Sequence, residues 1–430
     1  MKCFTDKLII IMGLLFLISD IADTGISMRQ KRKKVALIFN ANKAYDRGVI
    51  CGIGEYFQSS HCDWEIYIEE DFSSHDRAIS ADRYDGIIAD FDNPGMMEKL
   101  KHTQAAIVGL GGSYLTEEDY PPIPYVATDN QQLVEAALNH LRSKGLEYFA
   151  FYGFPEGEFW RWSKVREQAF LDYLNKEQLA GSVYNGFEPF EQNWNQIAAG
   201  LETWLRQLPK PAGILVATDA RARHLLMVCE HIGVMVPEQV AVIGIDNEEL
   251  TRYLSRISLS SVEQGTKAMG YEAAKMMNQL LAGNLTSPRR IMVPPVTVHA
   301  RESSDYRSLK DPLVMQAMSF IRSHACHSIK VEDVLLHLGV SRTNIENKFR
   351  QETGQTIHQA IFDFKLAKAK KLLAETHFDM KNIADQCGYP SVQYLYAIFK
   401  RIFNMTPLQY RDAWRADFAA GCGAMEAEWV

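Results

Sequence analysis

Between Lys34 and Arg301, short apolar runs typical of buried β-strands alternate with stretches of helical periodicity. The runs read KVALIFN, WEIYIEE, YDGIIAD, AAIVGLGG, YVATDN, YFAFYGF, GILVAT and VAVIGID. Two of the helical stretches read QQLVEAALNHLRSKG and RARHLLMVCEHIG, and Gly233 is expected to C-cap the second. Such alternation predicts an α/β domain of parallel sheets with helices on both faces. The segment is too long for one doubly wound unit and suits two lobes.

Two later segments, SRISLSSVEQG and RRIMVPPVTVHARESS, have the pattern of strands that return late in the chain. We therefore expect the chain to cross between the two lobes more than once. The polar stretch DYRSLKDP is interpreted as a linker, and only helical patterns follow it. The predicted boundaries are a body at 28–304, a linker at 305–312, an all-α domain at 313–415 and a C-terminal tail at 416–430.

The all-α domain contains an internal repeat. Val334 stands five residues before Gly339, and Ile383 stands five residues before Gly388. Each copy reads helix, tight turn, helix, which predicts two helix-turn-helix units. In the second helix of each copy, Ser341 or Ser391 is placed as N-cap. The apolar residues expected to face inward there are Ile345, Phe349, Leu395 and Phe399, with Ile398 as the alternative to Phe399.

The same second helices present polar residues on the opposite face. Arg, Asn, Gln and Lys read base edges or bind phosphates from a helix in the major groove. The stretch from Lys310 to Arg415 carries a net charge of +5 in a chain of net charge −7, which favours a polyanion partner for this domain alone. The alternative is a helical bundle with a solvated face. The predicted DNA-binding residues are Ser341, Arg342, Thr343, Asn344, Asn347, Lys348, Ser391, Gln393, Tyr396 and Lys400.

Motifs for catalysis and for metal binding are absent from the sequence. The seven cysteines are scattered, without CxxC, which argues against a disulfide framework or a zinc site and suits a reducing compartment. GLGGSY has Tyr114 at the third glycine position of a dinucleotide motif and no helix after it. HExxH, P-loop and nucleophile–His–Asp patterns do not occur. We therefore predict no enzyme, no metal and no cofactor.

The N-terminal stretch LIIIMGLLFLIS imitates the apolar part of a signal peptide, but it is too short for a helix to span a bilayer, which takes about 20 residues. Met28 precedes the basic run RQKRKK and the first strand pattern, so we interpret residues 1–27 as an upstream extension. Export is the alternative, and it would place the DNA-binding domain outside the cell. We therefore predict a cytoplasmic protein with no membrane partner.

The stretch IADQCGYPSVQYLYAIFK…TPLQYR resembles the signature of the arabinose-regulator (AraC) class of transcription factors, and the resemblance covers roughly residues 312–415. It implies that the two units, joined by the helix TIHQAIFDFKLAKAKKLL, enter successive major grooves of DNA. Three positions depart from the family pattern: Asn404 replaces a Gly, Leu335 a small Ala and Lys365 an Arg. Asn is the next-best residue for the left-handed conformation, so the first change is tolerable.

The body resembles the two-lobed, periplasmic-binding-protein-like sugar domain of lactose-repressor-type regulators. The segments FNANKAYDRGVI, IEEDF, IADFD, TDARARH, IGIDNEELTRYLSR and MVPP carry this resemblance. Together with the tail, they resemble the regulators of xylose operons. That resemblance implies an activator with D-xylose as effector, a homodimer on operator DNA, and RNA polymerase as a partner. The alternatives are a regulator for another pentose and an exported sugar-binding protein.

A pentose between two lobes needs carboxylates and amides for its hydroxyls and flat aromatic rings against its C–H faces. Such groups should stand where strands end, because loops from both lobes meet there. For each Asp the alternative role is a helix N-cap, and for each Trp it is core packing. The resemblance to the sugar-binding family supports five of the positions most: Asn42, Arg161, Asp219, Asp246 and Gln264. The full predicted set is Asn42, Tyr45, Asp46, Asp90, Arg161, Trp162, Trp194, Asp219, Asp246 and Gln264.

Overall fold

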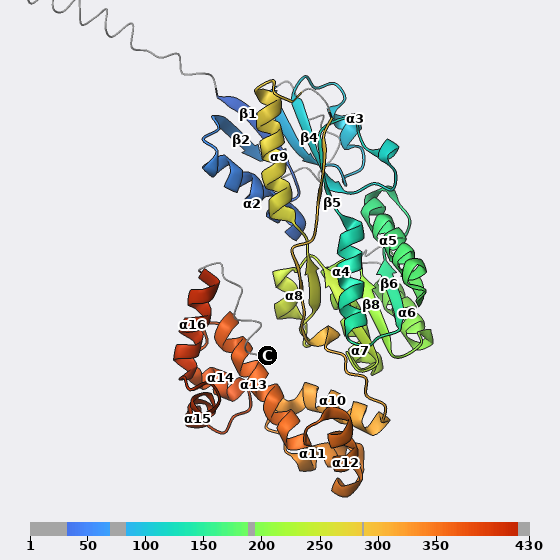
Figure 1. The fold of residues 1–430 in the computed structure, drawn as a ribbon, viewed down its shortest axis with the longest axis vertical. Helices are drawn as coiled ribbons and strands as arrows, with labels where there is room; N and C mark the ends of the chain where they lie inside the picture. Colours follow the sequence, from blue (N-terminus) through green and yellow to red (C-terminus); the bar gives the residue numbers. More distant parts are fainter. Residues whose placement is uncertain (1–31, 69–82, 188–193, 286–287, 420–430) are drawn as a thin grey trace, which may run out of the picture.

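The computed structural model describes residues 32–68, 83–187, 194–285 and 288–419, and Figure 1 shows two lobes followed by a helical domain. The first lobe has a six-stranded sheet in the order β11-β5-β4-β3-β1-β2, with every neighbouring pair parallel. Its strands are β1 (Lys33–Ile38), β2 (Trp64–Ile68), β3 (Gly86–Asp90), β4 (Ala106–Gly112), β5 (Tyr125–Thr128) and β11 (Arg290–Val293). Its helices are α2 (Ala44–Ser59), α3 (Met96–Leu100) and α9 (Thr266–Leu281).

The second lobe repeats this plan with the order β12-β10-β9-β8-β6-β7, in which only the β10–β12 pair is antiparallel. Its strands are β6 (Tyr148–Gly153), β7 (Ala180–Asn185), β8 (Ala212–Val216), β9 (Val240–Ile245), β10 (Ser260–Glu263) and β12 (Thr297–His299). Its helices are α4 (Asn130–Ser143), α5 (Arg161–Glu177), α6 (Trp194–Gln207), α7 (Asp219–Ile232) and α8 (Glu249–Leu254).

Both sheets are buried on both faces, as the apolar runs predict. In β1, Val35 and Leu37 belong to the core formed with α2 and α9, whereas Ala36 and Ile38 belong to the core on the α3 side. In the second lobe, α4 and α5 cover one face and α6 and α7 cover the other. The predicted fold class is therefore confirmed. Strand β7 was not predicted, because AGSVYN is short, weakly apolar and only partly buried at the edge of its sheet.

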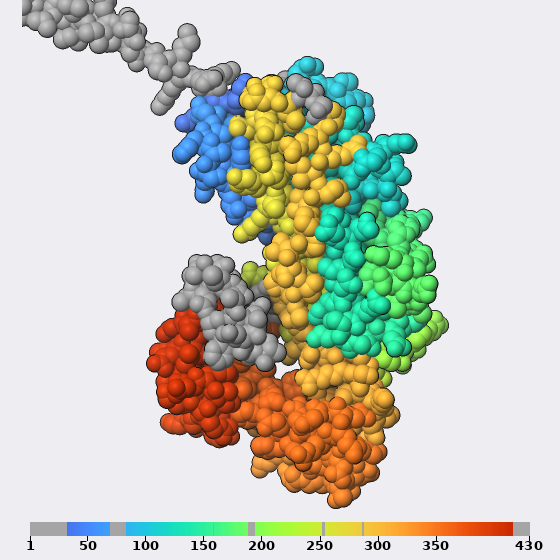
Figure 2. Space-filling model, viewed as in Figure 1, coloured from blue at the N-terminus to red at the C-terminus, as the bar shows by residue number. Residues whose placement is uncertain are grey.

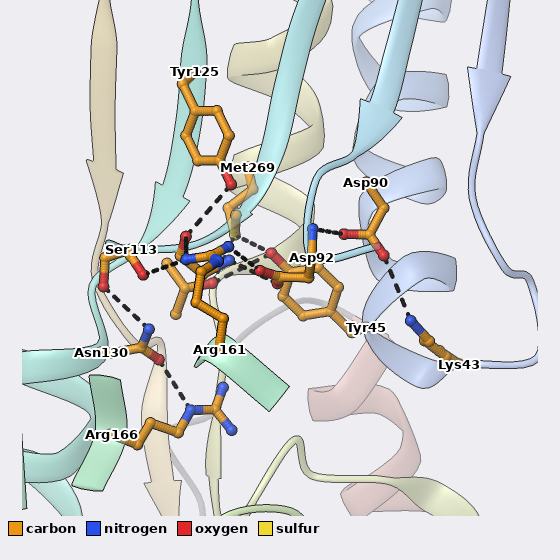
Figure 3. A network of polar contacts seen from close by, with 12 residues as sticks. Lys43, Tyr45, Asp90, Asp92, Ser113, Tyr125, Asn130, Arg161, Arg166 and Met269 are labelled. Carbon is orange, nitrogen blue, oxygen red and sulfur yellow. Dashed lines mark hydrogen bonds and ion pairs between the residues drawn. The ribbon is translucent and has the colours of Figure 1, made fainter. Parts of the chain in front are cut away.

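The chain crosses between the lobes three times. It leaves the first lobe after β5, returns with α9 and β11, and enters the second lobe again with β12. The prediction of more than one crossing is thus confirmed. As a result, the carboxyl ends of parallel strands from both lobes face the same boundary, where Figure 3 shows a network of polar side chains.

The helical domain consists of two similar units. Its helices are α10 (Pro312–His324), α11 (Val331–Leu338), α12 (Arg342–Thr353), α13 (Ile357–Glu375), α14 (Met380–Gln386), α15 (Val392–Phe403) and α16 (Pro407–Ala419). The two turns, at Gly339 and Gly388, both have φ of +65°, which favours glycine. The four residues expected to face inward are all fully buried, in two separate cores. Helix α13 joins the two units.

Most of the predicted caps are present. Gly233 ends α7 in the left-handed conformation, and Asn404 ends α15 in the same conformation. Ser391 caps α15 by accepting a hydrogen bond from Tyr394 N at 3.2 Å. Ser341 occupies the N-cap position of α12, but its side chain makes no capping hydrogen bond, so the predicted cap is only positional.

The segment 305–311 before α10, called the connector below, contains no strand or α-helix. The last residue of the predicted linker, Pro312, is the first residue of α10. The connector is nevertheless held at both ends. Tyr306 is buried in a core of the second lobe, whereas Leu309 packs against the core of the first helix-turn-helix unit.

Across the described ranges, no helix is long and apolar enough to span a membrane. Within the same ranges the cysteines are free, and no cluster of His, Cys, Asp or Glu is arranged to hold a metal ion. The predicted upstream extension at 1–27 and most of the predicted C-terminal tail lie outside the described residues.

Candidate effector cleft and nucleic-acid interface

Arg161 joins the two lobes at the centre of the polar network (Figure 3). It is the first residue of α5, and its guanidinium forms an ion pair with Asp92 of the first lobe. It also donates to Ser113 O at 2.8 Å and lies 3.6 Å from the ring centroid of Tyr114. Because all three partners belong to the first lobe, this predicted sugar-binding residue also bridges the boundary between the lobes.

Two further carboxylates of the first lobe, Asp46 and Asp90, lie near Asp92 of this ion pair. Asp90 accepts a hydrogen bond from Asp92 N at 2.9 Å, and its other oxygen lies 3.5 Å from Lys43 Nζ. Burial, together with the nearby charges of Asp92 and Asp46, raises the pKa of Asp90 to about 7. Burial likewise raises the pKa of Asp46 to about 6. The surroundings of Asp90 and Asp46 therefore favour the protonated carboxyl more than water does, because they compensate the charged form incompletely.

Asp46 shows this most directly. It is fully buried in the first turn of α2, and its Oδ2 accepts a hydrogen bond from Asn40 N at 2.6 Å. Its Oδ1 is buried and has no hydrogen-bond partner in the described part of the chain. A buried acceptor without a donor is costly, so this oxygen is a natural place for a ligand hydroxyl.

The second lobe contributes a buried arginine that the sequence did not single out. Arg166 donates to Asn130 Oδ1 at 2.9 Å, to Ala217 O at 2.6 Å and to Gln264 Oε1 at 3.1 Å. Gln264 in turn donates to Asp246 Oδ1 at 2.6 Å. Burial raises the pKa of Asp246 to about 6, against the opposing effect of Arg166. The predicted residues Asp246 and Gln264 thus bond to each other, and Arg166, which was not predicted, holds Gln264.

Other predicted sugar-binding residues lie in or near this boundary with different partners. The Tyr45 hydroxyl lies 3.3 Å from Thr128 Oγ1. Asp219 is fully buried, and its two oxygens accept from Ser261 Oγ at 2.7 Å and Glu248 N at 2.8 Å. Asp219 therefore fastens the loop after β9 within its own lobe. Direct contact of Asp219 with a sugar stays a prediction.

The remaining three predicted residues differ in exposure. Asn42 is exposed, and its carbonyl accepts from Arg47 at 2.9 Å. Trp162 packs against the second-lobe core, edge-on to Phe154. The structure does not bring Trp194 into the described network, since its ring packs against His224. Their roles against a sugar ring stay predictions.

Asp92, Asn130 and Lys43 also belong to the network and were not predicted. Asp92 and Asn130 follow predicted strands directly, in IADFD and YVATDN, so the rule used for the other carboxylates and amides could have found them. Arg166 lies inside α5, where nothing local distinguishes it from a surface arginine.

In the helical domain, α12 and α15 carry the predicted DNA-binding residues on their surface. Arg342 is paired with Glu346 one turn later at 2.7 Å, and Lys400 donates to Asn404 O at 3.0 Å. Lys348, predicted to reach a phosphate, is paired with Asp311 at 2.7 Å. The exposed members of the set are Ser341, Arg342, Thr343, Asn344, Asn347, Gln393 and Lys400, and the partly exposed ones are Lys348, Ser391 and Tyr396.

Three family models match the chain in succession. They describe an XylR N-terminal domain at residues 34–131, a periplasmic binding protein-like domain at 138–304 and a helix-turn-helix domain at 336–413. These matches agree with the two lobes and the helical domain seen in the structure. They also confirm the predicted combination of a sugar-binding-like body with a helix-turn-helix tail.

Two relatives and one solved structure match over nearly their whole length. The xylose operon regulatory protein of Haemophilus influenzae is 50% identical over 89% of this chain and 99% of its own. That of Escherichia coli K12 is 51% identical over 90% of this chain and 98% of its own. A solved structure described as the xylose-binding transcription activator xylR has a TM-score of 0.83 at 50% identity, covering 90% of this chain and 99% of that one.

A lac repressor dimer bound to operator has a TM-score of 0.51 at 14% identity, and it covers 64% of this chain and 95% of that one, which shows a shared fold only. The close relatives are transcription regulators, which confirms that the chain is a regulator and not an enzyme. Both xylose operon regulatory proteins share about half of their residues with the chain and are aligned with it almost from end to end. The chain belongs to the family of xylose operon regulatory proteins.

Proposed function

We propose that this chain is a cytoplasmic transcription activator that binds D-xylose between its two lobes and operator DNA through α12 and α15. The main observation in support of this effector site is that Oδ1 of Asp46 is buried and has no hydrogen-bond partner among the described residues. Asp46 lies among carboxylates at the boundary between the lobes, which Arg161 bridges. The near full-length similarity to an activator described as xylose-binding supports D-xylose as the effector. No cofactor is required.

The proposed sugar contacts divide between the lobes. Asp46 and Asp246 accept hydrogen bonds from sugar hydroxyls, and Arg161 donates. Charged groups suit this task because hydrogen bonds to them are stronger than those between neutral groups. Asn42, Tyr45, Asp90, Trp162, Trp194, Asp219 and Gln264 complete the proposed set. A sugar that contacts both lobes shifts the protein toward the closed arrangement only by the difference between its affinities for the closed and open arrangements.

The DNA-binding proposal rests on the polar, exposed faces of α12 and α15 in two equivalent units. We propose that a homodimer presents these faces to a repeated operator site and contacts RNA polymerase. The basic charge of the helical domain against the acidic body supports nucleic acid as the partner of this domain alone.

Calorimetry of the purified protein against D-xylose, L-arabinose and D-ribose tests the effector. We expect D-xylose to bind most tightly of the three sugars. We also expect it to raise the affinity of the protein for an operator duplex, which is identified by selecting the sequences that the protein binds from a random pool. Tighter binding of another pentose would point to the alternative effector. Absence of duplex binding at low salt would contradict the regulator assignment.

A further inference from the structure

Helix α10, the first of the helical domain, lies against the second lobe (Figures 1 and 2). Arg322 of α10 reaches Glu238, which precedes β9, with Nε at 3.3 Å and Nη2 at 3.2 Å from Glu238 Oε1. Only 8% of the arginine side chain and 3% of the glutamate side chain is exposed. The pair is therefore a buried ion pair between the body and the DNA-binding domain.

The stability of a buried ion pair at a domain boundary depends strongly on the presence of both partners. Each charge loses its hydration, and removal of either one leaves the other buried without compensation. Glu238 Oε2 is buried and has no partner within the described ranges, so Arg322 is the charge that compensates this carboxylate. The interface is consequently sensitive to the loss of a single group.

Arg322 also touches the helix that joins the two DNA-binding units. Its guanidinium lies 5.0 Å from the ring centroid of Phe364 in α13. The Arg322 side chain thus contacts both the second lobe and α13, the helix that connects the unit containing α12 to the unit containing α15.

The connector and the residues just before it are fixed to the same lobe. Ser303 Oγ donates to Val242 O at 2.6 Å and accepts from Ser260 N at 2.8 Å, both in the second-lobe sheet. Tyr306 then enters a core of this lobe. These contacts leave the chain little freedom before the helical domain begins.

At its other end the connector is tied to α12 itself. Glu352 of this helix accepts from Lys310 N at 2.8 Å and from Asp311 N at 2.9 Å. Asp311 pairs with Lys348 of α12 at 2.7 Å and also caps α10 through Leu313 N at 2.8 Å. The path from the second lobe to the helix predicted to read DNA is therefore made of short, direct contacts.

We propose that Glu238 and Arg322 are positioning residues that fix the helical domain to the second lobe. On this inference, which rests on the proposed function, a change in the angle between the lobes moves the second lobe, α12 and α15 as one body. The two side chains contact neither the sugar nor the DNA. They determine how much of the sugar signal reaches the DNA.

The test uses full-length protein with Glu238→Gln, Arg322→Met and the double variant. The control is Glu230→Gln, which breaks the exposed Glu230–Arg256 ion pair within the same lobe. Three quantities are measured: D-xylose affinity by calorimetry, operator affinity with and without D-xylose by fluorescence anisotropy, and hydrogen exchange of the amides in α10 and residues 306–311.

Each single variant should keep D-xylose affinity within about twofold and lose most of the sugar-dependent gain in operator affinity. Its amides in α10 and the connector should exchange at least about tenfold faster, while those of the sheets stay protected. The double variant should recover part of both losses, because no buried charge is left alone. The control should match the wild type.

Hydrogen exchange decides the inference even where the sugar response fails. Unchanged protection of α10 in both single variants would overturn it, as would an unchanged sugar response in both. If the wild-type protein itself shows no response to D-xylose, the proposed function fails, whereas faster exchange confined to α10 and the connector still supports the docking role.

Discussion

Asp46 illustrates how one residue can show a binding site in a protein of this kind. A buried acceptor with no donor costs about 1–3 kcal/mol, and a ligand hydroxyl that donates to it recovers this cost. The sequence placed Asp46 after the first strand, but only the packing of α2 against the sheet showed that Oδ1 is buried and unpaired.

Replacement of Asp46 with Asn removes the charge at constant size. We expect Asp46→Asn to weaken D-xylose binding about 10- to 100-fold, since the hydrogen bond to the sugar loses its charged acceptor. Asp63→Asn, in an exposed ion pair with Arg32, is the control and should leave the affinity unchanged. Calorimetry measures both, and equal affinities would assign Asp46 a structural role.

The raised pKa of Asp90 predicts a dependence of stability on pH. Its pKa of about 7 in the folded protein lies above the value near 4 of an unfolded chain. The folded protein therefore binds the proton more tightly, and this group favours folding at low pH and loses that contribution as pH rises through about 7. The free energy of unfolding of the sugar-free wild type should therefore rise as the pH is lowered from 7.5 to 5.5. In Asp90→Asn this rise should be smaller. Denaturant titrations at several pH values check this, and identical pH profiles would contradict it.

At the scale of elements, α12 and α15 show the same repeat with different surroundings. Arg342 stands at the start of α12, where helices enter the groove, whereas Lys400 lies two turns into α15. The repeat could be predicted from the sequence, from the spacing of the turn glycines and the helical period of the apolar residues. The pairing of Lys348 with Asp311 could not, because Lys348 lies in α12 whereas Asp311 lies in the connector before α10.

This difference predicts two kinds of DNA-binding defect. Arg342→Ala should weaken operator binding about tenfold or more and relax preference at one base pair. Lys400→Ala should weaken operator and scrambled duplexes alike and reduce the salt dependence by about one unit of slope. Anisotropy across a salt series distinguishes them, and equal losses on both duplexes for Arg342→Ala would refute base reading by this residue.

Helices α2 and α9 bring together segments from the two ends of the first lobe, and their approach depends on glycine. A Cβ at Gly270 would lie 2.0 Å from Val49 O, whereas a Cβ at Gly54 would meet nothing within 4 Å. Gly270→Ala should therefore lower the free energy of unfolding by about 1–3 kcal/mol or more through overpacking. Gly54→Ala, in the same helix pair, should raise it by about 0.5–1 kcal/mol. Chemical denaturation compares the two, and similar effects would exclude close packing as the cause.

At the scale of the whole molecule, two ion pairs among the described residues cross between the lobes. Arg161–Asp92 is largely buried, while Arg47–Glu248 at 3.2 Å is more exposed on the arginine side. Burial makes the first pair far more dependent on its partner than the second. Variants of the two pairs therefore distinguish the effect of the buried bridge on lobe closure from the effect of a more exposed ion pair between the lobes.

Arg161→Met should weaken D-xylose binding by about tenfold or more, because it removes a proposed sugar donor and the buried bridge between the lobes. Arg47→Met should change the affinity by no more than about fivefold. Small-angle scattering with and without D-xylose should show compaction in Arg47→Met and the wild type only. Full compaction of Arg161→Met at saturating sugar would contradict the bridging role.

Local pattern by itself determined the two doubly wound sheets, the late-returning strands, the repeated helix-turn-helix units and the left-handed caps at Gly233 and Asn404. These features follow from apolar periodicity and from the conformational preferences of single residues, both of which can be read within a few positions of the chain. The edge strand β7 escaped because it is short and only partly buried.

Only the tertiary structure decided which side chains meet. Arg166 reaches Gln264 across 98 positions of sequence, and Arg322 reaches Glu238 across 84. No local period encodes such pairs, since their partners are set by how the chain crosses between lobes and where α10 docks. Strand ends could therefore be named in advance as the edge of the proposed sugar site. The partners of Arg161 and Arg166, and the pair that joins the body to the DNA-binding domain, follow from packing alone.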